Sequence, residues 1–297
     1  GLLASLVVSF YPILYGLSRH FLLDFPLTAM VALSVWLLLR TEGFQRPVAS
    51  GLYGLSLGLG ILTKWTFVVF TVGPFLVVSI HALLDRPKPT LARIAMALAV
   101  AAIAATPWYF RNRVALVDVL GTQGTWASLE GDPAIASLRS WTYYLDALVN
   151  QQLLVPFTVF LFIGLGSMLV MGVDSHVWRL LGSWVALPYL VFSSFVNKDV
   201  RFTIPYLPAM AVMTALGLAR LRHRVLKNGL VVSMIVLGTI QYTGLTFGLS
   251  KRLASGSFPS ELTVSIGSAP IRVYAESVHI ASPPRSEPWP AQAILQK

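Results

Sequence analysis

The stretch GLYGLSLGLGILTKWTFVVFTVGPFLVVSIHALL, residues 51–84, contains one formally charged residue, Lys64. As a single helix it would extend about 51 Å at 1.5 Å per residue, well beyond the apolar core of a bilayer at roughly 30 Å. The stretch must therefore fold back on itself. We expect the break at residues 63–65, because a lysine at the middle of a membrane costs about 2.5 to 3.5 kcal/mol and the neighbouring Trp65 favours the membrane interface.

The rest of the chain has the same apolar character. Of 297 residues, 56% are hydrophobic and 11% are charged, against roughly 25% charged in an ordinary soluble domain, and the mean hydropathy is +0.71. This composition argues against a soluble globule and a disordered chain, and the lack of cysteine excludes a disulfide scaffold. The net charge of +10 does not indicate nucleic-acid binding, since the cations punctuate apolar runs and do not gather on one soluble face.

Apolar runs between charged or turn-rich breaks predict an all-α polytopic membrane protein with about nine transmembrane helices. They also predict a transmembrane domain over residues 1–249. Residues 250–297 are polar, with β-favouring pieces at 263–266 and 271–274 and a proline-rich stretch at 282–290, and we interpret them as the start of an extracytoplasmic soluble domain. The predicted helices cover residues 2–17, 21–39, 51–63, 66–84, 91–109, 153–172, 180–196, 203–219 and 229–248.

The beginning of the chain carries no targeting signal that we recognise. The apolar run after Gly1 has no basic n-region and no A-x-A cleavage site, so a signal peptide is not expected. We interpret the sequence as part of a longer protein.

The positions of Lys and Arg predict how the chain is oriented in the membrane. If residue 2 lies on the cytoplasmic side, the inner loops carry ten of these cations and the short outer loops carry four. The positive-inside rule favours this orientation. We therefore expect a multi-pass protein of the cell inner membrane, with the long loop over residues 110–152 and the polar residues 250–297 outside the cytoplasm.

Several charged residues fall on the predicted outer face. Cations converging on one membrane face suit an anionic headgroup such as a lipid phosphate. The alternative is that Lys and Arg near helix ends snorkel to lipid headgroups without a specific ligand. The candidate site residues are Arg19, Asp24, Lys64, Arg111, Lys198 and Arg201.

Asp24 lies in SRHFLLDFPLT, residues 18–28. One interpretation is an N-terminal helix cap, because Pro26 is tolerated in a first turn and the helix dipole favours an acid there. The other is a carboxylate at the membrane surface that acts as a base or a metal ligand. His20 precedes Asp24 by four residues and would share its face on a helix, although a lone histidine is a weak metal signal. The G-x-x-x-G spacing of Gly54 and Gly58 predicts close helix packing.

Four motifs, in this order, resemble bacterial polytopic glycosyltransferases of the GT-C type, in particular the group related to protein O-mannosyltransferases and the aminoarabinose transferase of lipid A. The resemblance covers roughly residues 1–220. The motifs are the stretch 18–28 quoted above, GLGILTK at 58–64, TPWY at 106–109 and NKDVRFTIPYLPA at 197–209.

This resemblance implies an enzyme that moves a sugar from a polyprenyl phosphate to a hydroxyl of a protein, lipid or glycan, outside the cytoplasm. Asp24 matches the second acidic position of the family and is the expected catalytic carboxylate, while Lys64, Lys198 and Arg201 match cationic positions near the donor phosphate. Arg19 and Arg111 join this phosphate-binding set by their predicted position on the outer face.

The sequence also departs from the family's pattern. The family's principal acid lies in a first outer loop that has no counterpart after Gly1, so the resemblance implies that this chain lacks its main general base and is inactive alone. Phe202 stands where many relatives have a tyrosine. No cofactor is implied, and a divalent metal is left open.

Two other functions are weighed against the enzyme. A transporter or lipid flippase would line a path with charges near the middle of the membrane, whereas these charges cluster at one face. A membrane anchor for an outer domain would not need so many passes. The expected partners are therefore the lipid-linked donor, a hydroxyl acceptor and the membrane, with no nucleic acid.

Overall fold

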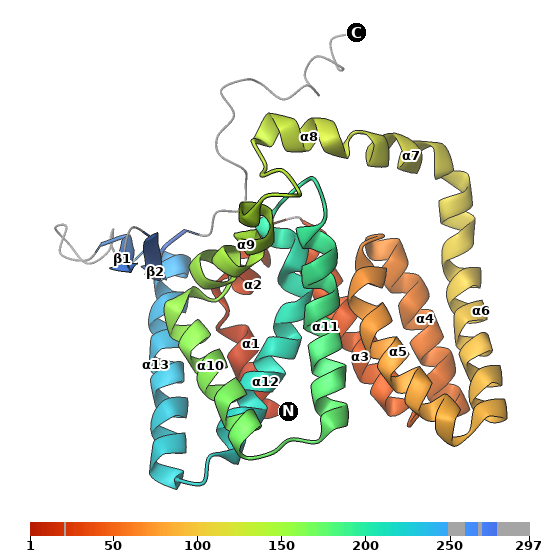
Figure 1. Cartoon of the computed structure of the whole chain (residues 1–297), viewed down its shortest axis with the longest axis horizontal. Coiled ribbons are helices and arrows are strands. Elements are labelled where there is room, and N and C mark those ends of the chain that lie inside the picture. Colours follow the sequence, from red (N-terminus) through yellow and green to blue (C-terminus); the bar gives the residue numbers. More distant parts are fainter. Residues whose placement is uncertain (21, 249–258, 267–268, 278–297) are drawn as a thin grey trace.

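The computed structural model describes residues 1–20, 22–248, 259–266 and 269–277. Most helices run side by side and end at two opposite rims (Figure 1). The upper rim contains the turns at 63–67 and 193–200 and the helices of residues 113–152. The lower rim contains the turns at 40–47, 85–87, 170–175 and 220–224.

The first third of the chain is helical and breaks where the sequence predicts. Helix α4 ends at Thr63 and α5 begins at Phe67, with Lys64 in extended backbone between them. The predicted pass over 2–17 is instead two short helices, because Pro12 has no backbone N–H to continue a helix and begins a new one. The helices are α1 (Leu2–Ser9), α2 (Pro12–Leu17), α3 (Asp24–Arg40), α4 (Pro47–Thr63), α5 (Phe67–Asp85) and α6 (Pro87–Arg111).

The segment expected as a long outer loop, 110–152, is also mostly helical. It forms α7 (Arg113–Gly121), α8 (Gln123–Glu130), α9 (Leu138–Ala147) and the π-helix η1 (Leu148–Gln152). Helices α7 and α8 run across the upper rim, nearly perpendicular to α6 (Figure 1). No residue of α7 is buried, so it is a helix lying along the rim and not a part of the core.

The remaining helices complete the bundle and pack around α12. This helix contacts α10, α1 and α11, while α11 also packs on α5. They are α10 (Leu154–Val170), α11 (Ser175–Ser193), the 3₁₀ helix η2 (Val200–Tyr206), α12 (Leu207–Arg220) and α13 (Arg224–Phe247).

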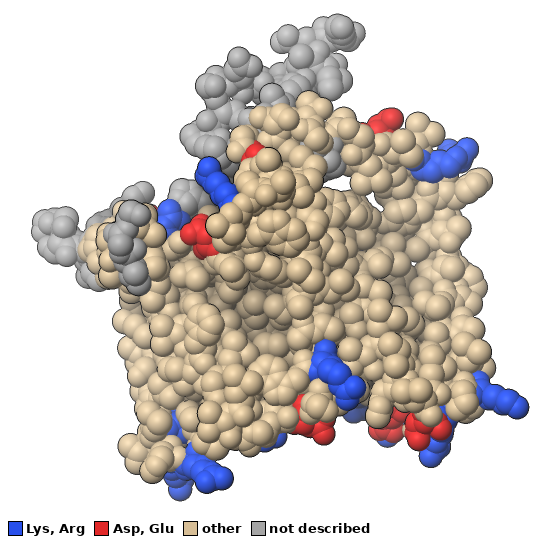
Figure 2. All heavy atoms as spheres, in the orientation of Figure 1, with Lys and Arg blue, Asp and Glu red and all other residues tan. Residues whose placement is uncertain are grey.

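The structure supports a membrane protein but does not confirm nine transmembrane helices. Within the described ranges, four helical stretches are long and apolar enough to cross a membrane: α5, α6, η2 with α12, and α13. A fifth is reached if the pair Leu138–Gln152 and Leu154–Val170, bent by 113°, counts as one span. Figure 2 agrees with a membrane belt, because uncharged surface separates two edges where charged side chains gather.

Glycines allow α4 and α6 to pack closely, as the G-x-x-x-G spacing predicts. A Cβ added at Gly54 would lie 2.3 Å from the carbonyl oxygen of Ala97, and one at Gly58 would lie 2.7 Å from the Cβ of Ala104. Neither position leaves room for a side chain, and the backbones approach as they do at small-residue contacts between membrane helices.

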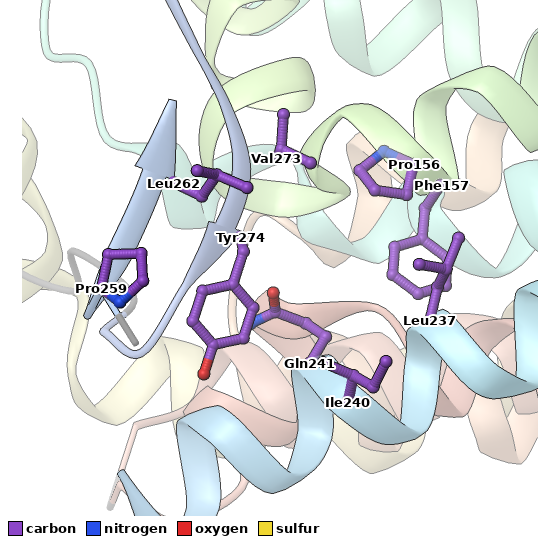
Figure 3. A pocket seen from close by; sticks show the side chains of 9 residues that line it. All are labelled: Pro156, Phe157, Leu237, Ile240, Gln241, Pro259, Leu262, Val273 and Tyr274. Atoms are coloured by element: carbon purple, nitrogen blue, oxygen red, sulfur yellow. The ribbon is translucent and has the colours of Figure 1, made fainter. Parts of the chain in front are cut away.

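The β-favouring pieces form a hairpin at the upper rim. Strands β1 (Glu261–Ile266) and β2 (Ala269–Ala275) pair antiparallel. The hairpin covers an apolar pocket of about 320 Å³ against α10 and α13, where Tyr274 and Gln241 lie side by side (Figure 3). The proline-rich stretch 282–290 lies outside the described residues, and the domain boundary near residue 250 stays a prediction.

Candidate functional site

Asp24 is the first residue of α3 and is almost fully buried, with 4% of its surface exposed. It is the acidic residue of the first turn of this helix, where the helix dipole favours a negative charge. Its Oδ1 accepts a hydrogen bond from Lys64 Nζ at 2.6 Å. The structure thus places Asp24 in the first helical turn, as the first interpretation expects, and also gives it a charged partner 40 residues away in sequence.

Lys64 reaches Asp24 because it lies in the break between α4 and α5. Its extended backbone separates two helices that pack against α3. Its Nζ also lies 5.3 Å from the centroid of the Phe202 ring on η2, which is cation–π geometry. The Lys64 side chain keeps 22% of its surface exposed, against 6% for Asp24. The ammonium is therefore the more accessible charge of the pair.

The turn before η2 carries a second ion pair. Asp199 accepts a hydrogen bond from the backbone N–H of Arg201 at 2.8 Å and caps η2 in this way. The same carboxylate accepts hydrogen bonds from Nε and Nη2 of the Arg201 side chain. Since η2 packs against α3 and Phe202 contacts Lys64, the structure brings the Arg201 turn beside the Asp24–Lys64 pair.

Lys198 lies three residues before Arg201 in the sequence, but its side chain is buried inside the protein. It is 2% exposed, and its Nζ donates to the carbonyl oxygens of Phe192 at 2.8 Å and Ser193 at 2.6 Å. Burial lowers the pKa of the Lys198 ammonium, and the Asp132 carboxylate opposes this shift. The lysine thus satisfies carbonyls at the end of α11, and its predicted contact with a donor phosphate stays a prediction.

The remaining two predicted phosphate ligands lie elsewhere on the upper rim. Arg19 donates from Nη2 to the hydroxyl of Thr246 near the end of α13. Arg111 is exposed at the end of α6, where α6 meets the outer end of the α7–α8 segment (Figure 1). Among the contacts of the described residues, neither arginine bonds to Asp24, Lys64 or Phe202, and their contact with a donor phosphate stays a prediction.

The structure does not favour a metal centre built on His20 and Asp24. His20 lies in the turn before α3 and is exposed, because the helix begins only at Asp24. The two residues therefore do not share a helical face. Within the described ranges, no three His, Asp or Glu side chains are grouped to hold a metal ion.

Sequence reasoning missed two residues that shape this region. Asp132 Oδ2 accepts a hydrogen bond from the Lys198 backbone N–H at 2.7 Å, which fastens the chain after α8 to the turn before η2. Gln152 is fully buried and bonds to η2. Its signal in the sequence was an amide directly before the apolar run of α10.

The Asp24–Lys64 pair offers hydrogen-bond donors for an anion and a carboxylate oxygen for a proton. An ammonium has three N–H donors, and Asp24 accepts one from Lys64, so the others can bind an anionic oxygen. Of the two Asp24 oxygens, Oδ1 accepts the Lys64 bond, which leaves Oδ2 to take up a proton. The pair can therefore stabilise a leaving anion and accept a proton within one small region.

Comparison with known proteins confirms the predicted resemblance to polytopic glycosyltransferases. Residues 1–108, which include Asp24 and Lys64, match the family model described as dolichyl-phosphate-mannose-protein mannosyltransferase. No solved structure matches the chain at a significant level.

Two curated relatives extend the similarity along the chain. An undecaprenyl phosphate-alpha-4-amino-4-deoxy-L-arabinose arabinosyl transferase of Aeromonas salmonicida is 28% identical over 234 residues, covering 72% of this chain and 40% of the relative. A similarly named transferase of Sodalis glossinidius is 27% identical over 235 residues, covering 72% and 39%. The chain thus spans about two fifths of the length of these relatives.

Proposed function

We propose, on the premise of this similarity, that the protein is a membrane glycosyltransferase. It takes a sugar from a polyprenyl-phosphate donor and passes it to a hydroxyl acceptor at the upper rim, which faces out of the cytoplasm. The observation that carries this proposal is the buried Asp24–Lys64 pair, because it lies within the matched residues and at the rim that a lipid headgroup reaches.

In the proposed reaction the acceptor oxygen forms a bond to the anomeric carbon, and the bond from that carbon to the phosphate oxygen breaks. The polyprenyl phosphate leaves with the electron pair, and its growing negative charge is stabilised by the Lys64 ammonium. Donors placed in advance toward such a charge are worth about 10² to 10³ in rate. The acceptor proton passes to Asp24 Oδ2.

Arg201 and Lys198 have different parts in this proposal. Arg201 is bonded to Asp199, which balances its charge, so in this proposal it contributes to the phosphate site through the N–H donors of its guanidinium and not through net charge. Lys198 holds the end of α11 and thereby fixes the start of the turn that carries Arg201. The donor sugar and the acceptor are left open.

Because the resemblance implies that this chain is inactive alone, the decisive experiment measures sugar transfer in liposomes by a purified longer protein that contains it. The donors are polyprenyl-phosphate mannose and undecaprenyl-phosphate 4-amino-4-deoxy-L-arabinose, and the variant is Lys64→Met. We expect transfer from one donor, reduced about 10²- to 10³-fold in the variant. The control is Arg46→Met, which breaks the exposed ion pair with Glu42 on the lower rim. Equal rates in both variants would remove Lys64 from the site.

A labelling experiment tests which rim faces outward. The chain has no cysteine, so a single introduced cysteine reports its own position. Ala136→Cys lies at the exposed upper rim and Gln45→Cys at the exposed lower rim. We expect an impermeant maleimide to label Ala136→Cys in intact spheroplasts and Gln45→Cys only after permeabilisation. The reverse pattern would overturn the orientation.

A further inference from the structure

The chain departs from regular helix just before α10. Residues Leu148–Gln152 form a π-helix, in which Leu153 N–H bonds to Leu148 C=O at 2.9 Å. Leu154 then has φ +63° although it is buried and not a glycine, and the helices on either side are bent by 113°. A π-helix is rare, a non-glycine residue in the left-handed region is strained, and both cluster at functional sites.

The last residue of this π-helix is bonded entirely to η2. Gln152 is 0% exposed. Its Nε2 donates to Val200 C=O at 2.8 Å and to Thr203 Oγ1 at 2.8 Å, which uses both N–H groups of the amide. Its Oε1 accepts from the Tyr206 hydroxyl at 3.2 Å. One buried side chain thus connects the start, the middle and the end of η2.

The same π-helix also holds the hairpin. Asn150 Oδ1 accepts from the backbone N–H of Arg272 on β2 at 3.0 Å. A second buried amide, Gln241 on α13, forms the matching anchor: its Nε2 donates to Ala275 C=O, and its Oε1 accepts from Ala275 N–H at 3.3 Å. Gln241 therefore resembles Gln152 in type and burial but bonds to the hairpin and not to η2.

We infer that Gln152 is a positioning residue, which fixes η2 so that the Phe202 ring faces Lys64. The inference rests on the proposed function. It follows from geometry, because the residues bonded to Gln152 lie on both sides of Arg201 and Phe202 along the chain. A shift of η2 would move the Phe202 ring away from the Lys64 ammonium, now 5.3 Å distant, and misplacement by about 1 Å costs on the order of 10²-fold in rate.

The first test needs no activity. Hydrogen–deuterium exchange is measured in liposomes for the peptides over residues 199–206 and 269–276, comparing Gln152→Met with the control Gln241→Met. We expect exchange at 199–206 to rise about tenfold in Gln152→Met, since several hydrogen bonds to η2 are lost. We expect it to be unchanged in Gln241→Met, whose faster exchange is confined to 269–276.

Thr203→Val is the milder second variant, in case Gln152→Met does not fold. It is nearly isosteric and removes one acceptor, the Thr203 Oγ1 that Gln152 bonds, so a rise of a few fold at 199–206 is expected. Unchanged exchange at 199–206 in the folded variants, or an equal rise in Gln241→Met, would overturn the inference.

The second test measures transfer and separates the two proposals. We expect kcat for sugar transfer to fall on the order of 10²-fold in Gln152→Met and to stay near the wild-type value in Gln241→Met. If exchange behaves as expected but the wild-type protein transfers no sugar, the proposed function fails and the fixing of η2 stands. If the wild-type protein is active and Gln152→Met loosens η2 without lowering kcat, the positioning role is overturned.

Discussion

Two lysines of the upper rim, Lys64 and Lys198, both bond to groups of the protein, but their partners differ. Lys64 bonds a carboxylate 40 residues away and keeps 22% of its side chain exposed. Lys198 is 2% exposed and bonds backbone carbonyls five and six residues before it.

The difference shows that charge at a membrane face is not by itself a binding site. Lys198 adds a charged donor to two carbonyls near the end of α11, and this bonding uses its ammonium inside the protein. A lysine on a carboxylate, with part of its surface accessible, holds its ammonium ready for an incoming anion. Sequence reasoning grouped the two because both follow apolar helices on the same side.

The largest expected effect concerns the carboxylate that distinguishes the two lysines. We predict that Asp24→Asn lowers the single-turnover rate of sugar transfer about 10²- to 10⁴-fold, the range for a lost general base. The control is Asp118→Asn on α7, whose side chain is exposed. A rate for Asp24→Asn within about threefold of the control, below the usual contribution of acid–base groups, would exclude this role.

The variant Lys198→Met tests whether Lys198 acts on protein stability, in contrast to the proposed role of Lys64 in transfer. We predict a loss of about 1 to 3 kcal/mol in the free energy of unfolding in detergent, because the carbonyls of Phe192 and Ser193 each lose a charged donor. The effect on transfer should remain well below that of Lys64→Met. If Lys198→Met left stability unchanged and abolished transfer, Lys198 would act in the transfer reaction and the structural role given to it here would be wrong.

Phe202→Leu probes the cation–π contact between Lys64 and η2. Removing the ring loses a cation–π interaction worth about 1 kcal/mol, so we predict a rise of about fivefold in KM for the donor. Phe202→Tyr keeps the aromatic face and should leave KM near the wild-type value. A larger defect in the tyrosine variant than in the leucine variant would show that the ring does not act on Lys64.

The smallest effect is expected at the two arginines outside the cluster. Arg19→Met and Arg111→Met should each change the transfer rate by about twofold or less, because isolated surface polar groups contribute little. A loss comparable to that of Lys64→Met in either variant would place that arginine in the phosphate site.

Features set by local chemistry were predictable from the sequence. The fold-back at Lys64 follows from the length of the apolar stretch and its single charge. Close helix packing at Gly54 and Gly58 follows from their spacing, although the spacing does not specify α6 as the partner. The strands near 263–266 and 271–274 follow from their β-branched and aromatic residues. Each of these features depends on residues that are close together in the sequence, so the order of residues is enough to predict it.

Features that depend on distant partners were not predictable. The pairing of Asp24 with Lys64 requires α3 to pack against the α4–α5 turn, and the buried position of Lys198 requires a particular direction of its side chain. Each helix within residues 113–152 has ten residues or fewer, too few to cross a membrane alone, so the apolar runs predict a loop there. Gln152 gave only the signal of an amide before an apolar run, and this signal does not specify the partner to which the amide bonds.

The central claim is that Asp24 and Lys64 act as one unit. A double-mutant cycle on the rate of sugar transfer tests it, using Asp24→Asn, Lys64→Met and the double variant in liposomes. Residues that act together are strongly non-additive, so we predict that the double variant is about as slow as the slower single variant. If the two losses multiply, each residue acts independently and the proposed pair does not exist as a functional unit.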